Sequence, residues 1–304
     1  MNVAVDAAVC LLLITAAVVG LVTVDRSPAA THGAADAVAD SLATTTGHVN
    51  YSLAPGVREM RTSTPTTDGV PAVALDSPEL HRTAHGSLAG LLARGAMAGS
   101  GVDLDRERGR GSTADLSPLT RSRVQFGTAV SDAVRARTGA SVRIDAMWRP
   151  YPGAPVGGHL GVGPEPSSGR VHAATLRIPT GVEPPALPAA DGFDRLGTIV
   201  AERTVTVLVP PGPARLTLRG DDPAAALVRH RYARLATATD ASVAAPLATE
   251  DTAAANARIA RRLAPRMTAD LRSQYESPEE AASAVSVSSV RIVVRTWDDA
   301  GGER

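Results

Sequence analysis

The segment SVRIDAMW, residues 141–148, alternates aliphatic and polar side chains, which is typical of a strand with one buried and one solvated face. The same four residues, Ser-Val-Arg-Ile, begin again at Ser289 inside SSVRIVVRTW, residues 288–297, and a tryptophan follows shortly in both cases. Arginines fall on one face of each predicted strand and aliphatic residues on the other. A duplicated α–β unit would explain the match, and so would independent strand chemistry in a chain rich in Ser, Val and Arg.

Around these two segments the sequence predicts an α+β head domain with antiparallel strands. A helix starting at Ser77, with Pro78 in its first turn, is expected to run for about twenty residues. Residues 48–75 and the glycine-rich stretch Gly157–Gly163 are expected to be irregular. Further predicted strands are 171–178, 203–209 and 214–219, and further predicted helices are 33–45, 117–138, 223–238 and 249–275.

Near the start of the chain, residues 7–24 read AAVCLLLITAAVVGLVTV, an uncharged and mostly apolar run. As a helix, residues 3–24 would extend for about 33 Å, which matches a bilayer core of about 30 Å. The segment lacks the basic leader of a cleavable signal, so we expect a single, uncleaved transmembrane helix. The only cysteine, Cys10, lies inside it, so no intramolecular disulfide is possible. The expected organisation is a transmembrane anchor at 1–27, a loop-rich and helical stalk at 28–116 and the α+β head at 117–304.

The charge composition indicates which classes of partner the protein is expected to bind. Arginine supplies all of the 31 Lys and Arg residues, and the 31 acidic residues balance them to a formal net charge of zero. A general nucleic-acid binder would show a basic excess, so nucleic acid is not an expected partner. The absence of lysine and the abundance of alanine are typical of a GC-rich genome.

Two residues near the predicted anchor carry candidate roles. Asp6 is the one acidic residue in the apolar region, and it could reach the headgroups or pair with the chain's own amino group. The segment also resembles the helix of type IV pilin-like proteins, and this resemblance implies that Asp6 pairs with a neighbouring subunit's amine in an assembly. Asn50 begins an Asn-Tyr-Ser glycosylation sequon, which favours a head outside the cytoplasm. Arg26 favours the opposite orientation, with the head in the cytoplasm.

No pattern in the chain predicts catalysis, cofactor binding or a metal centre. His81 and His85 have a spacing that places two imidazoles together on a helix, but no third ligand follows. The adjacent carboxylate pairs are better explained as helix starts. The arginine pairs at 229–231 and 261–262 could meet anionic lipid or phosphate, although solvated helix faces explain them as well.

The apolar N-terminal segment with its early Asp6, followed by a lysine-free head containing SVRIDAMWRP and VRIVVRTW, resembles uncharacterised membrane-anchored proteins that haloarchaea encode alongside pilin-like genes. The resemblance implies a surface or cell-envelope role and transfers no functional residue. We therefore expect a single-pass membrane protein, not an enzyme, whose extracytoplasmic head binds other envelope or pilin-like proteins. No small-molecule substrate is identified. The alternatives are an envelope hydrolase with His159 or His172 beside a carboxylate, and a membrane-tethered regulator facing the cytoplasm.

Overall fold

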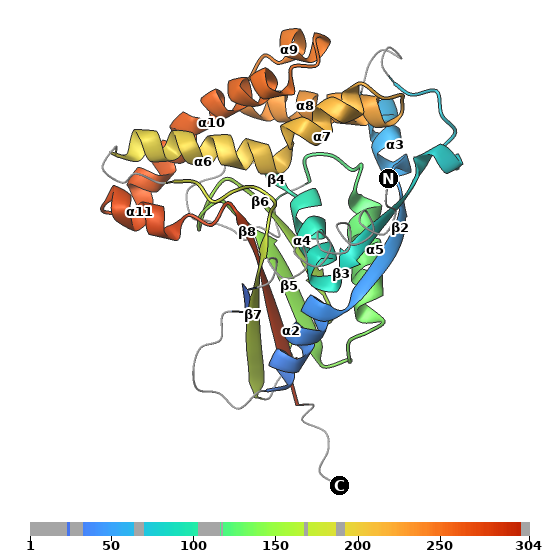
Figure 1. Ribbon diagram of the computed structural model, residues 1–304, viewed down its shortest axis with the longest axis vertical. Helices are drawn as coiled ribbons and strands as arrows, with labels where there is room; N and C mark the ends of the chain where they lie inside the picture. Colours follow the sequence, from blue (N-terminus) through green and yellow to red (C-terminus); the bar gives the residue numbers. More distant parts are fainter. Residues whose placement is uncertain are drawn as a thin grey trace, which may run out of the picture.

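The computed structural model describes residues 23–24, 33–63, 70–102, 116, 118–166, 170–186 and 192–298. In these residues the chain forms a six-stranded sheet, a two-stranded hairpin and a layer of helices across one end of the sheet (Figure 1). All strand pairs are antiparallel. The described fold is therefore α+β with antiparallel sheets, as expected from the alternating segments.

The six-stranded sheet has the order β1-β7-β8-β5-β6-β4. The two segments that predicted the sheet, β5 and β8, pair with each other at its centre, with Ile144 opposite Val294 and Ala146 opposite Ile292. These four side chains are buried because they share the face toward the helices. The strand bounds are Thr23–Val24 for β1, Gly101–Val102 for β4, Val142–Trp148 for β5, Val156–Val162 for β6, Val171–Pro179 for β7 and Ser289–Trp297 for β8.

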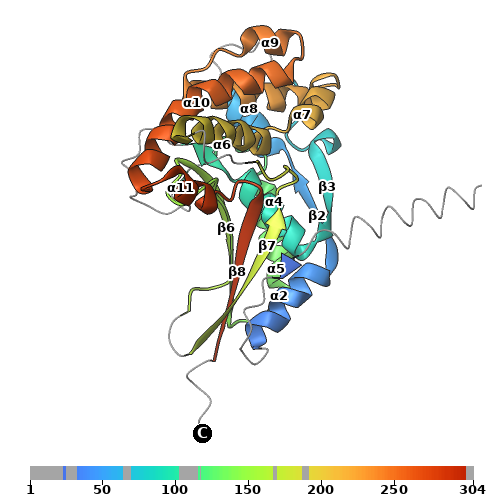
Figure 2. The same ribbon diagram turned by 60° about the vertical axis from the view of Figure 1, so that its left-hand side comes forward.

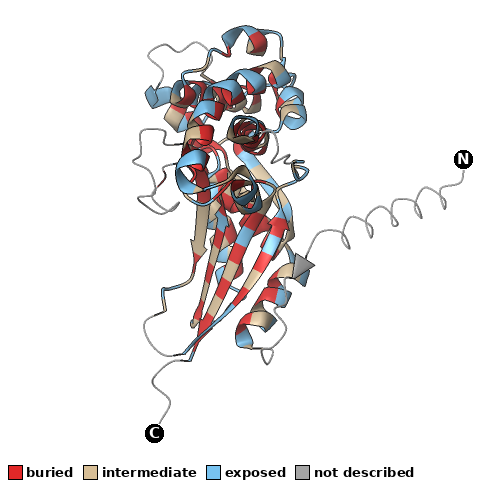
Figure 3. Ribbon diagram, turned by 90° about the vertical axis from the view of Figure 1, so that its left-hand side faces the viewer, coloured by how far each residue is buried: buried red, intermediate tan, exposed pale blue. Residues whose placement is uncertain are grey.

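Three helices cover the buried face of the sheet: α2 (Ala34–Thr44), α4 (Leu88–Ala98) and α5 (Val124–Arg135). Below the helical layer, Figure 3 shows buried positions along the strands alternating with intermediate and exposed ones. The opposite face includes the charged residues Arg143, Asp145 and Arg291. Strand β6 replaces the loop expected at Gly157–Gly163. Its Gly158 lies so close to α4 that a Cβ there would meet the carbonyl oxygen of Ala96 at 2.0 Å, so glycine is required by packing and not by a turn.

The helical layer contains α6 (Gly192–Leu208), α7 (Pro211–Leu218), α8 (Ala224–Thr239), α9 (Ala244–Ala248), α10 (Thr252–Gln274) and α11 (Pro278–Ala284). Residues 203–209 and 214–219, predicted as strands from their Val and Thr content, lie in α6 and α7. The prediction was wrong because Leu196, Val200 and Thr204 recur at the helical interval and are buried, and because α6 packs along α10. Tertiary burial thus outweighs the strand propensity of β-branched residues.

The hairpin consists of β2 (Thr46–Ser52) and β3 (His81–Ser87), and it stands beside α4 and α5 (Figure 2). Two predictions were wrong here. Residues 48–75, expected to be irregular, include most of β2 and the helix α3 (Ala54–Ser63). The helix expected from Ser77 is instead a 3-10 turn at Pro78–Leu80, then β3, then α4, which Ser87 caps by accepting a hydrogen bond from the Gly90 amide.

The expected fold class is corrected in its first element, the transmembrane helix. No helix in the part of the chain that the structure describes has the length and hydropathy to cross a membrane. Most of the predicted helix lies outside the described residues, but its last two residues, Thr23 and Val24, form strand β1 and pair with Arg177 and Leu176 of β7. Both are β-branched and extend the edge of the sheet, so no helix continues through Val24.

The core is continuous from α2 to β8. It includes buried residues from both sides of position 116, where the expected stalk ends and the expected head begins. Although aromatic residues make up only 3% of the chain, Trp148, Tyr151 and Tyr232 are fully buried. The Trp148 indole N–H donates to the carbonyl of Val287 at 3.0 Å. The Tyr232 hydroxyl donates to Asn256 at 2.9 Å, which joins α8 to α10.

Candidate functional site: an arginine pocket

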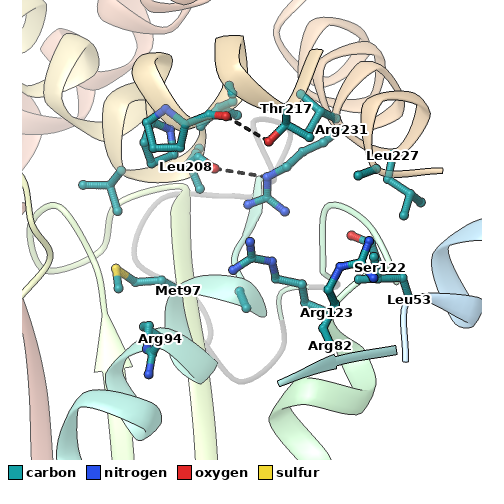
Figure 4. A pocket seen from close by; sticks show the side chains of 18 of the residues that line it. Leu53, Arg82, Arg94, Met97, Ser122, Arg123, Leu208, Thr217, Leu227 and Arg231 are labelled. Atoms are coloured by element: carbon teal, nitrogen blue, oxygen red, sulfur yellow. Dashed lines mark hydrogen bonds between the residues drawn. The ribbon is translucent and has the colours of Figure 1, made fainter. Parts of the chain in front are cut away.

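A cavity of about 460 Å³ lies where the helical layer meets the hairpin and α4. Its walls come from β2 and β3 on one side, from α4 and the start of α5 below, and from the ends of α6, α7 and α8 above (Figure 4). A volume of this size accommodates a small organic ligand. Because the walls belong to elements from distant parts of the sequence, the cavity exists only in the folded chain.

Four arginines line this cavity, which we call the arginine pocket: Arg82 of β3, Arg94 of α4, Arg123 immediately before α5, and Arg231 of α8. Three of them are held by backbone carbonyls. Arg231 donates from Nε to Leu208 at 3.1 Å, Arg82 donates to Glu79 and His81 at 2.7 Å each, and Arg94 donates to His85. These bonds position the guanidinium groups without neutralising them.

Arg123 and Arg231 face each other across the pocket (Figure 4). Burial lowers the pKa of Arg231 to about 10, with the charge of Arg123 as the second cause. Burial likewise lowers the pKa of Arg94, and Arg123 again contributes. In both cases the pKa is lowered by partial loss of water and by a neighbouring positive charge.

No carboxylate among the described residues forms an ion pair with any of the four arginines. Unpaired buried charges are unfavourable, and opposed cations add repulsion. An anion placed between the guanidinium groups would remove both costs and could accept bidentate hydrogen bonds. The charges that line the pocket would therefore suit an oxyanion.

The remainder of the pocket is largely apolar. Leu53 of the chain between β2 and α3, Met97 of α4, and Leu227 of α8 lie around the arginines (Figure 4). Val207, Val209 and Val228 also line the pocket. This combination suits a ligand with one charged group and an apolar body, because each part finds matching surroundings.

Only one of these arginines carried a sequence signal. Arg231 belongs to the pair at 229–231 for which phosphate or anionic lipid was considered, and it lines the pocket. Arg229 instead lies on the surface near Asp222, at 3.8 Å. Arg82, Arg94 and Arg123 were missed as ligand-binding residues because no local spacing connects residues that three separate elements bring together.

The paired histidines do not form the arrangement that a helix would give. His81 and His85 lie in β3, where a separation of four residues corresponds to about 13 Å, so they do not share a metal. His85 instead lies opposite His48 of β2, with ring centroids 5.8 Å apart. The carboxylate pair Glu279–Glu280 begins α11, as its sequence context predicted.

The hydrolase alternative required a histidine beside a carboxylate, and His159 of β6 meets that condition. Its Nε2 lies 3.0 Å from Asp145 of β5. The same carboxylate accepts hydrogen bonds from Arg143 at 2.8 Å and from Arg295 at 2.6 Å. Asp145 thus neutralises two arginines as well as orienting the imidazole, and no hydroxyl or thiol among the described residues is hydrogen-bonded to His159. His172 is exposed at the start of β7.

The remaining sequence candidates are Asp6 and Asn50. Asp6 lies outside the described residues. Asn50 is exposed on β2, and its side-chain oxygen accepts a hydrogen bond from Thr83 of the neighbouring strand at 2.7 Å. Its glycosylation stays a prediction, as do the expected membrane and pilin-like partners.

Comparison with known proteins gives one match. Residues 5–297 match the model of a family of unknown function, DUF7284, and the chain therefore belongs to that family. No curated protein and no solved structure matches the chain.

Proposed function

We propose that this chain, a member of the DUF7284 family, is a binding protein whose arginine pocket takes an organic anion with a phosphate or carboxylate head and an apolar body. The observation that carries the proposal is the opposition of Arg123 and Arg231 across the cavity, with no ion-pairing carboxylate among the described residues. A protein that only needed a stable core would place an apolar or paired residue at position 231.

The charged part and the apolar part of the pocket each match one part of the proposed ligand. The oxyanion head binds between Arg123 and Arg231, with Arg94 adding positive charge. The apolar body packs against the leucine, valine and methionine side chains. A fully hydrophilic anion such as inorganic phosphate engages only the first half and binds more weakly.

The test is calorimetric titration of the full chain with hexyl phosphate, hexanoate, inorganic phosphate and hexanol. The proposal predicts that hexyl phosphate or hexanoate binds at least tenfold more tightly than either inorganic phosphate or hexanol. The phosphate and carboxylate arms identify the preferred head group.

Variants assign the binding to the pocket. Arg123→Ala and Arg231→Met should each weaken binding of the preferred probe at least tenfold, because each removes a charged hydrogen-bond donor to the head group. Arg215→Ala is the matched control, since Arg215 is exposed on α7 and does not line the pocket. Equal binding of hexanol and the anionic probes, or wild-type affinity in both pocket variants, would contradict the proposal.

We retain a role in envelope assembly as a second proposal. It is supported by the resemblance to haloarchaeal proteins encoded beside pilin-like genes and by an open, charged face of the sheet. Co-purification of the full chain with envelope subunits from its native cells would support it, and a protein recovered only without partners would count against it.

A further inference from the structure

The solvent side of the six-stranded sheet, which we call the sheet face, carries four arginines in two directly opposed pairs. Arg177 of β7 lies opposite Arg291 of β8, and Arg295 of β8 lies opposite Arg143 of β5. Like charges directly opposite each other on neighbouring strands destabilise a sheet. The arrangement therefore calls for a compensating negative charge.

The pair Arg143–Arg295 has a compensating negative charge within the chain. Asp145 accepts hydrogen bonds from Arg143 and Arg295. Arg177 and Arg291 are exposed, and no carboxylate among the described residues forms an ion pair with either. This second pair therefore has no compensating carboxylate among the described residues and is open to one from a partner.

An apolar strip accompanies the unpaired arginines. Met147 of β5 lies directly opposite Arg291 and is 38% exposed, one of few large apolar side chains in the described chain with so much open surface. Val293, next to Arg291 on the same face of β8, is half-buried. A matching surface would combine carboxylates with apolar side chains.

We propose that the sheet face docks an acidic, amphipathic segment of another protein, with its carboxylates on Arg177 and Arg291 and its apolar side chains on Met147 and Val293. Charge complementarity selects this occupant. A second copy of the chain would bring the same arginines against each other if it docked through the same face. A single-stranded nucleic acid would find no exposed aromatic side chain for stacking among the described residues of this face.

The test measures fluorescence anisotropy of a labelled twelve-residue peptide of alternating Glu and Leu, titrated with the full chain. A companion peptide carries Lys at every Glu position. The acidic peptide should bind with an affinity that falls as salt rises, and the basic peptide should not bind. The double variant R177E/R291E should weaken binding of the acidic peptide at least tenfold, and Met147→Ser should weaken it severalfold.

R215E is the matched control, because it reverses an exposed arginine on the helical layer; it should bind within twofold of wild type. Twelve-nucleotide oligothymidylate and vesicles of phosphatidylglycerol test the other anionic occupants. The proposal is overturned if the acidic peptide does not bind at 1 mM protein, if R177E/R291E binds it like wild type, or if either alternative probe binds more tightly through the same two arginines.

Discussion

In the sheet face, Arg143 donates two hydrogen bonds to Asp145, and this carboxylate raises the pKa of Arg143 against the effect of burial. In the arginine pocket, Arg231 faces another arginine, and burial lowers its pKa to about 10. Arg143 is thus paired with a carboxylate, whereas Arg231 forms no ion pair with any carboxylate among the described residues. The difference teaches that an arginine with little access to water stabilises the fold when a carboxylate neutralises it and costs stability when no such partner is near.

Removing Asp145 should give the largest effect on stability. Asp145→Asn keeps the shape of the side chain but leaves Arg143, Arg295 and His159 without their shared negative charge. The Asp145 side chain is only 13% exposed, so we expect the free energy of unfolding to fall by about 3 kcal/mol. Urea denaturation measures the change. Glu165→Gln, which removes the 72% exposed second partner of Arg143, should cost less than about 0.5 kcal/mol.

The pH dependence of stability should test whether the Asp145 carboxylate stabilises the sheet face. Burial alone would raise the pKa of Asp145, but hydrogen bonds and charges from His159 and Arg143 outweigh it and hold the pKa well below its usual range. A lowered folded pKa means that the stabilisation is complete above the unfolded pKa of about 3.9 and is lost as pH falls toward the folded value. The difference in unfolding free energy between wild type and Asp145→Asn should therefore be constant from pH 7 to 5 and shrink below pH 4. A difference that stays constant down to pH 3 would contradict the assignment.

Replacing Arg231 should have the opposite effect on stability from replacing Asp145. Arg231→Met removes a charge that no carboxylate among the described residues pairs with, and it retains an apolar stem. The ligand-free protein should therefore keep or gain stability, by up to about 1 kcal/mol. Loss of the hydrogen bond to the Leu208 carbonyl offsets part of the gain. Thermal unfolding in low-phosphate buffer measures the balance. A loss above about 1 kcal/mol would show that Arg231 serves the fold and not a ligand.

The smallest effect should come from the unpaired arginines of the sheet face. Arg177→Glu places a carboxylate directly opposite Arg291, and we expect the free energy of unfolding to rise by about 0.2–1 kcal/mol. The gain should disappear when Arg291→Ala is added, because the cross-strand pair is then absent. Urea denaturation of wild type, the two single variants and the double variant gives the four unfolding free energies of a double-mutant cycle.

Prediction from sequence succeeded where one segment contained its own signal. The alternation of 141–148 and 288–297 placed the two central strands and predicted that their arginines would face solvent. The structure confirms this for Arg291, whereas Arg143 lies on the same face with its side chain only 16% exposed. Prediction from sequence failed where packing or pairing with a distant element determined the secondary structure. The Val- and Thr-rich residues 203–209 complete α6 and the turn after it because α10 covers one side, and His81 and His85 lie in a strand because β2 pairs with it.

The candidate site was predictable only in part. Arg231 stood in an arginine pair considered for phosphate, but a solvated helix face explained that pair as well, since interleaved charges elsewhere in the chain are common. Nothing near Arg123 distinguishes it from the other arginines of a lysine-free chain. Its role arises from the position of α8 above the start of α5, which is a property of the packed helical layer.

By itself the sequence determined the antiparallel α+β class and which face of each central strand is buried, because hydrophobic periodicity acts within a single segment. Only the tertiary structure decided which arginines pair with a carboxylate and which, among the described residues, do not. That outcome depends on distances between side chains from β3, α4, α5 and α8, and on how far water is excluded from them. Neither quantity is encoded in any one stretch of the chain.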